Sequence, residues 1–189
     1  MVYDIVIKDG FIFDGTGAPR VRGDIGITEG HVSAIGRVDS KNAKKVIDAA
    51  GMHVAPGFVD LHTHYDAQIF WDPYCTLSGW HGITSVAIGN CGFGFAPVDP
   101  DMREYAMKSM TRVEAIPYDS MAQGMPWDWT TFPEYLDSLE RTPKAMNILP
   151  YVPIGPMLIQ ILGLADAKAG RMPTVEEHEA LSKMLHEAM

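Results

Sequence analysis

The stretch that decides the fold is Pro56-Gly57-Phe58-Val59-Asp60-Leu61-His62-Thr63-His64. It predicts a strand over residues 58–64, entered from a Pro-Gly turn. Because successive side chains of a strand point to opposite faces, His62 and His64 would share one face with Asp60. Two imidazoles at one strand end can bind one metal ion, and imidazole suits zinc. The alternative is a pair of ordinary histidines at the end of a strand.

The residues before this stretch predict a small β domain over residues 1–55. Alternating apolar residues indicate a first strand from Tyr3, and Asp9-Gly10 predicts a hairpin turn into a return strand at 11–13. Glu29-Gly30 predicts a second hairpin, and residues 45–48 a further strand. Short strands at this spacing are typical of a small sandwich or open barrel.

The residues after it predict alternating strands and helices over residues 56–189. Apolar runs at 83–89 and 147–152 indicate two further strands. Asp99-Pro100 predicts the start of a helix that runs to about Glu114, with Pro at its first position. Capping boxes predict two more helices, and they lie at Thr131–Glu134 and Thr174–Glu177. This alternation predicts βα units and a parallel sheet.

The length limits how much of such a fold the chain can build. A closed (β/α)8 barrel needs roughly 250 residues. Of 189 residues, 134 remain after the first 55, which is enough for about three βα units. The last helical pattern reaches Met189 without a stop signal. We therefore expect the N-terminal part of a longer protein, with a smaller open sheet as the alternative.

A second candidate ligand follows the strand predicted at 83–89. Gly89-Asn90-Cys91-Gly92 would place Cys91 at the same sheet edge as the two histidines. A thiolate is a good zinc ligand, and the alternative is a small buried thiol. Cys75 follows no predicted strand, so we expect it to pack in the core.

Composition excludes several classes of protein. With 24 acidic and 15 basic residues the net charge is −9, which argues against a nucleic-acid or anionic-membrane surface. Two cysteines argue against a disulfide framework. The sequence has no apolar run of the ~18 residues that a membrane helix needs. Its first residues also lack the basic segment followed by an apolar one that marks a secretory signal. We therefore expect a cytoplasmic protein.

Several motifs together carry a family resemblance. Besides residues 56–64, they are Tyr65-Asp66-Ala67-Gln68, Trp71-Asp72-Pro73, Trp80-His81-Gly82-Ile83-Thr84, Gly89-Asn90-Cys91-Gly92-Phe93-Gly94-Phe95-Ala96-Pro97-Val98 and Gly124-Met125-Pro126-Trp127. The chain resembles the N-acyl-D-amino-acid deacylases, or D-aminoacylases, of the amidohydrolase superfamily. The likeness extends over essentially all of residues 1–189, and the Asn-Cys-Gly run is its most selective part.

The resemblance implies an α/β fold, with a small β-sandwich joined to a metal-dependent (β/α)8 barrel. His62 and His64 would bind metal, and Cys91 would hold a tightly bound zinc in the bridging place of a carboxylated lysine. Whether a second, weaker metal site exists is left open. The implied reaction is hydrolysis of the amide of a small-molecule N-acyl-D-amino acid, and the resemblance does not identify the acyl group or the D-side chain.

The expected catalytic residue lies outside this chain. In the family, two more histidine ligands and the catalytic Asp come from later strands, so that Asp would lie beyond residue 189. Asp60 and Asp66 would support the site, and His178 and His186 on the last helix would be surface or packing residues. We therefore expect residues 1–189 alone to be inactive.

One departure and two rival functions qualify the resemblance. Val152-Pro153-Ile154-Gly155 stands where the family commonly has Val-Pro-His-Gly. Ile154 would therefore shift specificity if that histidine touches substrate or orients a ligand. A cyclic-amide hydrolase of the dihydropyrimidinase or hydantoinase type is one rival, against which Cys91 argues. The other is a non-catalytic chain, either truncated or one subunit of a split assembly.

We predict that residues 1–189 self-associate in solution. A partial barrel exposes strand edges and apolar faces that favour pairing between copies. Size-exclusion chromatography with light scattering should show oligomers or poor solubility. A cooperative melt of a monomer would contradict this prediction.

Overall fold

The computed structural model describes residues 2–189, which form two compact units, residues 2–56 and 57–189. Each unit has its own sheet, and the chain is a mixed α/β protein as predicted. Within the described residues neither sheet closes into a barrel. No helix in this part of the chain is long and apolar enough to cross a membrane.

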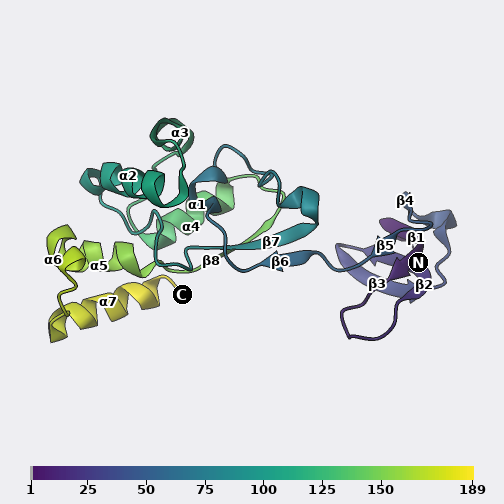
Figure 1. Cartoon of the computed structure of the whole chain (residues 1–189). Helices are drawn as coiled ribbons and strands as arrows, with labels where there is room; N and C mark the ends of the chain where they lie inside the picture. The colour runs from purple at the N-terminus through teal and green to yellow at the C-terminus, as the bar shows by residue number, and fades with distance from the viewer. Residues whose placement is uncertain (1) are drawn as a thin grey trace. The chain divides into compact units, whose positions relative to one another are not determined.

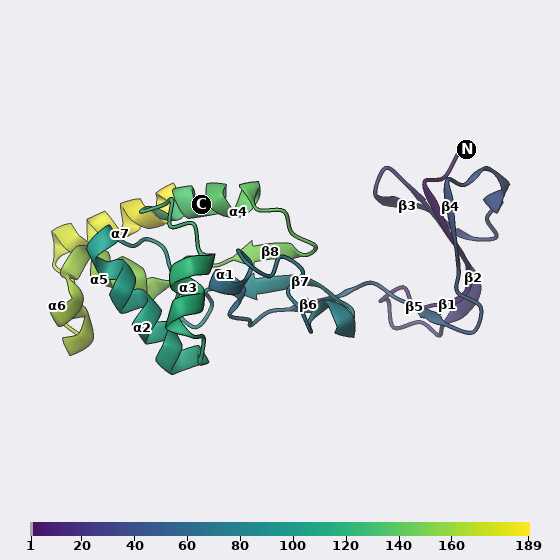
Figure 2. The ribbon, with the colours of Figure 1, turned by 90° about the horizontal axis from the view of Figure 1, so that it is seen from above.

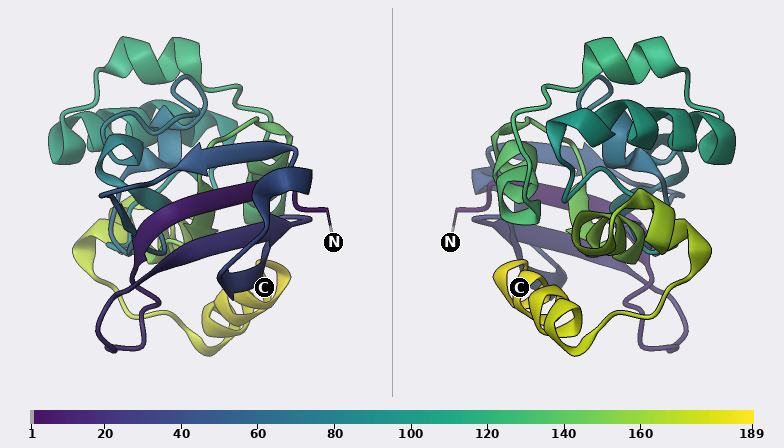
Figure 3. Two further views of the ribbon diagram at one scale, coloured as in Figure 1. Left: turned by 90° about the vertical axis from the view of Figure 1, so that its right-hand side faces the viewer. Right: turned by 90° about the vertical axis from the view of Figure 1, so that its left-hand side faces the viewer.

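The first unit is one mixed five-stranded sheet (Figure 3, left). Its strands are β1 (Ile5–Ile12), β2 (Val21–Thr28), β3 (His31–Gly36), β4 (Lys45–Asp48) and β5 (His53–Val54). The order is β3-β2-β1-β4, with β5 also on β1; β2 is antiparallel to β1 and β3, whereas β4 and β5 run parallel to β1. The predicted hairpin at Glu29-Gly30 joins β2 and β3, so that prediction is confirmed.

The predicted hairpin at Asp9-Gly10 is wrong. Strand β1 continues through both residues, and its register against β2 shifts between Ile7 and Gly10. Asp9 has a φ of 60°, and its backbone N–H donates to Oδ1 of Asp24 at 2.9 Å. Because the Asp24 side chain satisfies this amide, the turn-forming pair is absorbed as a bulge within one strand.

The second unit combines a three-stranded parallel sheet with seven α-helices (Figures 1 and 2). The strands are β6 (Phe58–Asp60), β7 (Ile83–Ile88) and β8 (Asn147–Pro150), in the order β6-β7-β8. The helices are α1 (Tyr65–Gln68), α2 (Arg103–Glu114), α3 (Tyr118–Gly124), α4 (Phe132–Arg141), α5 (Ile154–Leu162), α6 (Leu164–Ala169) and α7 (Val175–Glu187). The prediction of parallel strands connected through helices is confirmed.

Both predicted capping boxes are formed. At the start of α4, Thr131 Oγ1 accepts the N–H of Glu134 at 3.4 Å, and Glu134 Oε2 accepts the N–H of Thr131 at 2.9 Å. The same pair of bonds begins α7. These side chains satisfy N–H groups that have no partner within a helix, which is why the sequence placed both helix starts correctly.

The core of the second unit lies where the helices meet the sheet. Figure 1 shows α2, α3 and α4 on one side of the three strands. Trp129 is fully buried there, and its indole N–H donates to the carbonyl of Phe95 at 2.8 Å. The hydroxyl of Tyr135 donates to the carbonyl of Asp66 at 2.9 Å. Cys75 is also completely buried, as predicted.

We predict that Tyr135→Phe lowers the free energy of unfolding by about 1–2 kcal/mol, because it leaves the buried carbonyl of Asp66 without a donor. Urea unfolding followed by circular dichroism measures the change. Tyr74→Phe is the matched control, since Tyr74 is exposed and its variant should stay within about 0.5 kcal/mol of the parent. Equal stability of the two variants would contradict a structural role for the Tyr135 hydroxyl.

Candidate metal centre

The strand predicted over residues 58–64 ends earlier than expected. Strand β6 stops at Asp60, whose Oδ1 accepts the backbone N–H of His62 at 3.1 Å. His64 is the residue that precedes α1. The prediction of a continuous strand to His64 is therefore wrong, because the Asp60 side chain takes an amide that would otherwise extend the ladder. The two histidines lie in a short loop at the sheet edge.

This loop is held against the end of β7. Both the N–H and the hydroxyl of Thr63 donate to the carbonyl of Ala87, at 3.0 and 2.7 Å. The side-chain amide of Asn90 donates to the carbonyl of Leu61. The segments that follow β6 and β7 are thus bonded to each other directly, which positions the histidine loop beside Cys91.

A glycine allows the chain to turn out of β7 just before Cys91. Gly89 has a φ of 78°, and a Cβ on it would meet the carbonyl oxygen of Tyr151 at 2.6 Å. A side chain is excluded on both grounds. The sharp turn directs Cys91 back over the strand ends rather than along the sheet.

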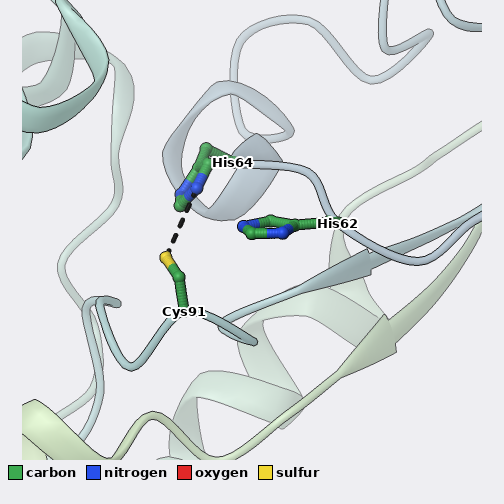
Figure 4. Close-up of side chains that lie close together, drawn as sticks. All are labelled: His62, His64 and Cys91. Carbon is green, nitrogen blue, oxygen red and sulfur yellow. Dashed lines mark hydrogen bonds between the residues drawn. The ribbon is translucent and has the colours of Figure 1, made fainter.

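His62, His64 and Cys91 converge on one point (Figure 4). One ligand atom from each lies within 4.8 Å of the others, and the two imidazole rings are 5.5 Å apart between centroids. His64 Nε2 lies 3.4 Å from Cys91 Sγ. Nitrogen and sulfur ligands of one tetrahedral zinc ion lie about 3.6 Å apart. The donor set and this spacing therefore fit zinc, with three of its four usual ligands.

A carboxylate that sequence reasoning did not identify also lies at this point. Glu114, at the end of α2, places Oε1 3.3 Å from His64 Nε2. The side chains of both residues are mostly buried. No motif or spacing connects Glu114 with the histidines, so only the packing of α2 against the loop could reveal it. Negative charge beside the ligand nitrogen favours a cation there.

Asp66, predicted to support the site, is buried. It is 3% exposed, and its Oδ2 has no hydrogen-bond partner in the described structure. Burial, and to a smaller extent the charge of Glu114, raise the pKa of this carboxyl to about 7. Asp66 therefore holds its proton across the mildly acidic range, and its charged form carries a desolvation cost.

The histidines of α7 take no part in this cluster, whereas Ile154 lies near it. His178 and His186 are exposed on α7, in agreement with the surface role predicted for them. Ile154 begins α5 and is half exposed. The next residue of the helix, Gly155, donates its N–H to the carbonyl of Gly92 at 3.0 Å, so the start of α5 is bonded to the loop that carries Cys91.

Residues 45–152 match the model of the Amidohydrolase family. The whole chain is 34% identical to an uncharacterized protein of Mycobacterium tuberculosis, of which it covers 31%. Over 98% of its length it is 32% identical to an N-acyl-D-aspartate deacylase of Alcaligenes xylosoxydans xylosoxydans, of which it covers 34%.

A solved structure shows the same arrangement of elements. The N-acyl-D-glutamate deacylase of Bordetella bronchiseptica, crystallised with zinc and a phosphonate inhibitor, aligns with the whole chain at a TM-score of 0.80 and 29% identity. The alignment covers 36% of that protein, at its N-terminal end. The chain thus spans about a third of the length of the relatives it matches.

We predict that zinc protects one thiol and leaves the other unaffected. Cys91 is exposed, whereas burial, and then the charge of Asp72, raise the pKa of Cys75 to about 11. In metal-free protein, Ellman's reagent should label Cys91 alone, and zinc should slow this labelling at least about tenfold, since a coordinated thiolate is not free to react. Cys91→Ser, the control, should show no labelling before unfolding. Equal rates with and without zinc would contradict the site.

We also predict that Glu114→Gln weakens zinc binding about tenfold, because it removes a negative charge next to His64 Nε2 without changing size. Competition with a chromophoric chelator measures the affinity. Glu104→Gln is the control on the same helix, where the carboxylate is exposed and paired with Lys108. An affinity unchanged in both variants would show that Glu114 has no part in the site.

Proposed function

Because the chain belongs to the amidohydrolase family, we propose that it serves the zinc-dependent hydrolysis of N-acyl-D-amino acids to a carboxylate and a free D-amino acid. The observation that carries this proposal is the convergence of His62, His64 and Cys91 on one point. The relation to an N-acyl-D-aspartate and an N-acyl-D-glutamate deacylase supports the choice of substrate class.

The residues of this chain would hold the metal and shape its surroundings. His62, His64 and Cys91 would be ligands, and zinc, when bound, supplies polarisation of the amide carbonyl and a water of lowered pKa. Asp60 fixes the backbone of His62 through its 3.1 Å hydrogen bond. Glu114 adds negative charge at His64. The remaining ligands and the Asp that moves the proton would come from outside residues 1–189.

The same proposal extends to the architecture. We take β6, β7 and β8 as the first three strands of a (β/α)8 barrel that other segments would complete. In this view the sheet of residues 1–55 is part of a small sandwich to which both chain ends contribute. The (β/α)8 arrangement places active sites at the carboxyl ends of its strands, which is where the three donors lie here.

The open sheet favours a second candidate function. Phe58, Val59 and Leu149 of the sheet are each about half exposed or more. A chain that ended near residue 189 would leave these apolar side chains for a partner to cover. In that case it would be a non-catalytic chain, or one subunit of a split assembly, that contributes part of a metal site.

An assay with the zinc-loaded product of the native reading frame tests the proposal. N-acetyl-D-amino acids should release free D-amino acid, whereas the L-enantiomers and hydantoins should not react. Cys91→Ala should lower kcat/KM by more than about 100-fold through loss of metal. His81→Ala, an exposed histidine outside the cluster, should retain activity and zinc content.

The contrary results are equally specific. Hydrolysis of hydantoins instead of acyl-D-amino acids would favour the cyclic-amide hydrolases. Zinc bound by the parent and lost in Cys91→Ala, with no substrate hydrolysed, would favour the split-subunit function. Full zinc content and full activity in Cys91→Ala would exclude the proposed site.

A further inference from the structure

A cavity of about 250 Å³ opens beside Cys91. It lies between the loop after β7, helix α2 and helix α5, all within the second unit. Its walls are mostly apolar and include Phe93, Met102, Ala106, Met110, Ile154 and Ile159. The cavity therefore begins at a candidate metal ligand and leads away from it between two helices.

The walls of this cavity are tied together. At one end, Gly155 at the start of α5 donates its N–H to the carbonyl of Gly92 at 3.0 Å. At the other, the side-chain amide of Gln160 on α5 donates to Oδ2 of Asp99, which precedes α2, at 2.8 Å. Because both bonds join walls that come from separate elements, the shape of the cavity exists before any ligand binds, and little ordering cost opposes binding.

The charge of the lining selects the kind of ligand. The lining contains no Lys, Arg or His among the residues that the structure describes there. Its one carboxylate, Asp99, is bonded to Gln160, and the Lys168 ammonium lies over the ring of Tyr105 without itself lining the cavity. A buried carboxylate needs a cation or several donors, so this lining disfavours an anionic group and favours a neutral apolar one.

These features distinguish the two arms of an N-acyl amino acid. On one side of the scissile carbonyl is the acyl chain, which is apolar and neutral. On the other is the amino-acid part, which carries a carboxylate. The side chain of the amino acid shares its carbon with that carboxylate, so its entry would bring the anion to the mouth of the cavity. With the carbonyl near Cys91, the acyl chain is the part that enters an apolar cavity without cations and brings no charge with it.

We propose that this cavity binds the hydrocarbon chain of the substrate's acyl group. The assignment rests on the proposed function for the identity of the substrate as an acyl amide. Its volume of about 250 Å³ holds about eight groups of water size, at roughly 30 Å³ each, so acyl chains of about six to eight carbons fit. Ile154 lines the cavity next to Gly92 and is about half exposed, so we take it as the residue that sets the polarity of the entrance.

Binding of simple primary amides tests this assignment without requiring hydrolysis. Isothermal titration of the purified protein with butanamide, hexanamide and octanamide should show affinity rising about fourfold per methylene until the cavity is full. Affinity that does not depend on chain length would overturn the assignment.

Two variants locate the binding. Ala106→Phe fills the cavity from α2 and should weaken octanamide binding at least about tenfold, while the affinity for butanamide should change little. Ala122→Phe, at an exposed position of α3, is its control.

Ile154→Asp places a charge at the entrance on a half-exposed residue, so the variant should fold normally and bind octanamide about tenfold more weakly. Val175→Asp, the exposed first residue of α7, is its control. Octanamide bound equally well by Ile154→Asp and the parent would overturn the assignment.

The outcome is separable from that of the proposed function. If the protein hydrolyses N-acyl-D-amino acids but its affinity for primary amides does not depend on chain length, the assignment of the cavity to the acyl chain is overturned and the deacylase function stays in place. Length-dependent amide binding that Ile154→Asp abolishes, without hydrolysis of any N-acyl-D-amino acid, would support the apolar-chain cavity and overturn the deacylase function.

Discussion

The parallel pairing of β6 and β7, with Asp60 opposite Val86, sends two segments of chain out of the sheet at the same edge. The meeting of the three candidate ligands depends on this register. Parallel strands end together, so the residues after Asp60 and those after Ile88 meet although more than twenty residues separate them. Thr63 bonds the first segment to Ala87, and the left-handed turn at Gly89 brings Cys91 back over it.

The charges around His64 follow from the packing of α2 on this edge. Glu114 reaches the imidazole from the last turn of that helix. The negative charge of Glu114 also contributes to the raised pKa of the buried Asp66 carboxyl. Two carboxyl groups in a largely buried place favour protonation of one of them, and here it is Asp66 whose pKa is raised. A cation held by the histidines and Cys91 would offset the same repulsion. The site is thus electrostatically suited to positive charge.

The helices that flank the loop after β7 give this edge a second property. Helices α2 and α5 line one cavity together with the loop that carries Cys91. Hydrogen bonds join α5 to Gly92 of this loop and to Asp99, which precedes α2. An apolar cavity therefore adjoins a cluster of metal-binding donors. A polar reacting group and an apolar chain could be bound together there, each by the surface that suits it.

Local chemistry made much of the fold predictable. Thr131 and Thr174 begin helices because their side chains satisfy N–H groups within the next turn, and Glu29-Gly30 forms its hairpin for similarly local reasons. The same local reasoning failed at Asp9-Gly10. There the amide of Asp9 is satisfied by Asp24, fifteen residues away, and the strand continues.

The sequence by itself determined which residue types could bind a metal and where along the chain they occur: His62, His64 and Cys91, each near a predicted strand end. Only the tertiary structure decided that they meet, that Glu114 joins them and that a cavity opens at Cys91. The physical reason is the sequence separation over which these interactions act. Strand alternation and helix caps act over a few residues, whereas Glu114 and His64 are fifty residues apart and meet only because a helix packs against a sheet edge.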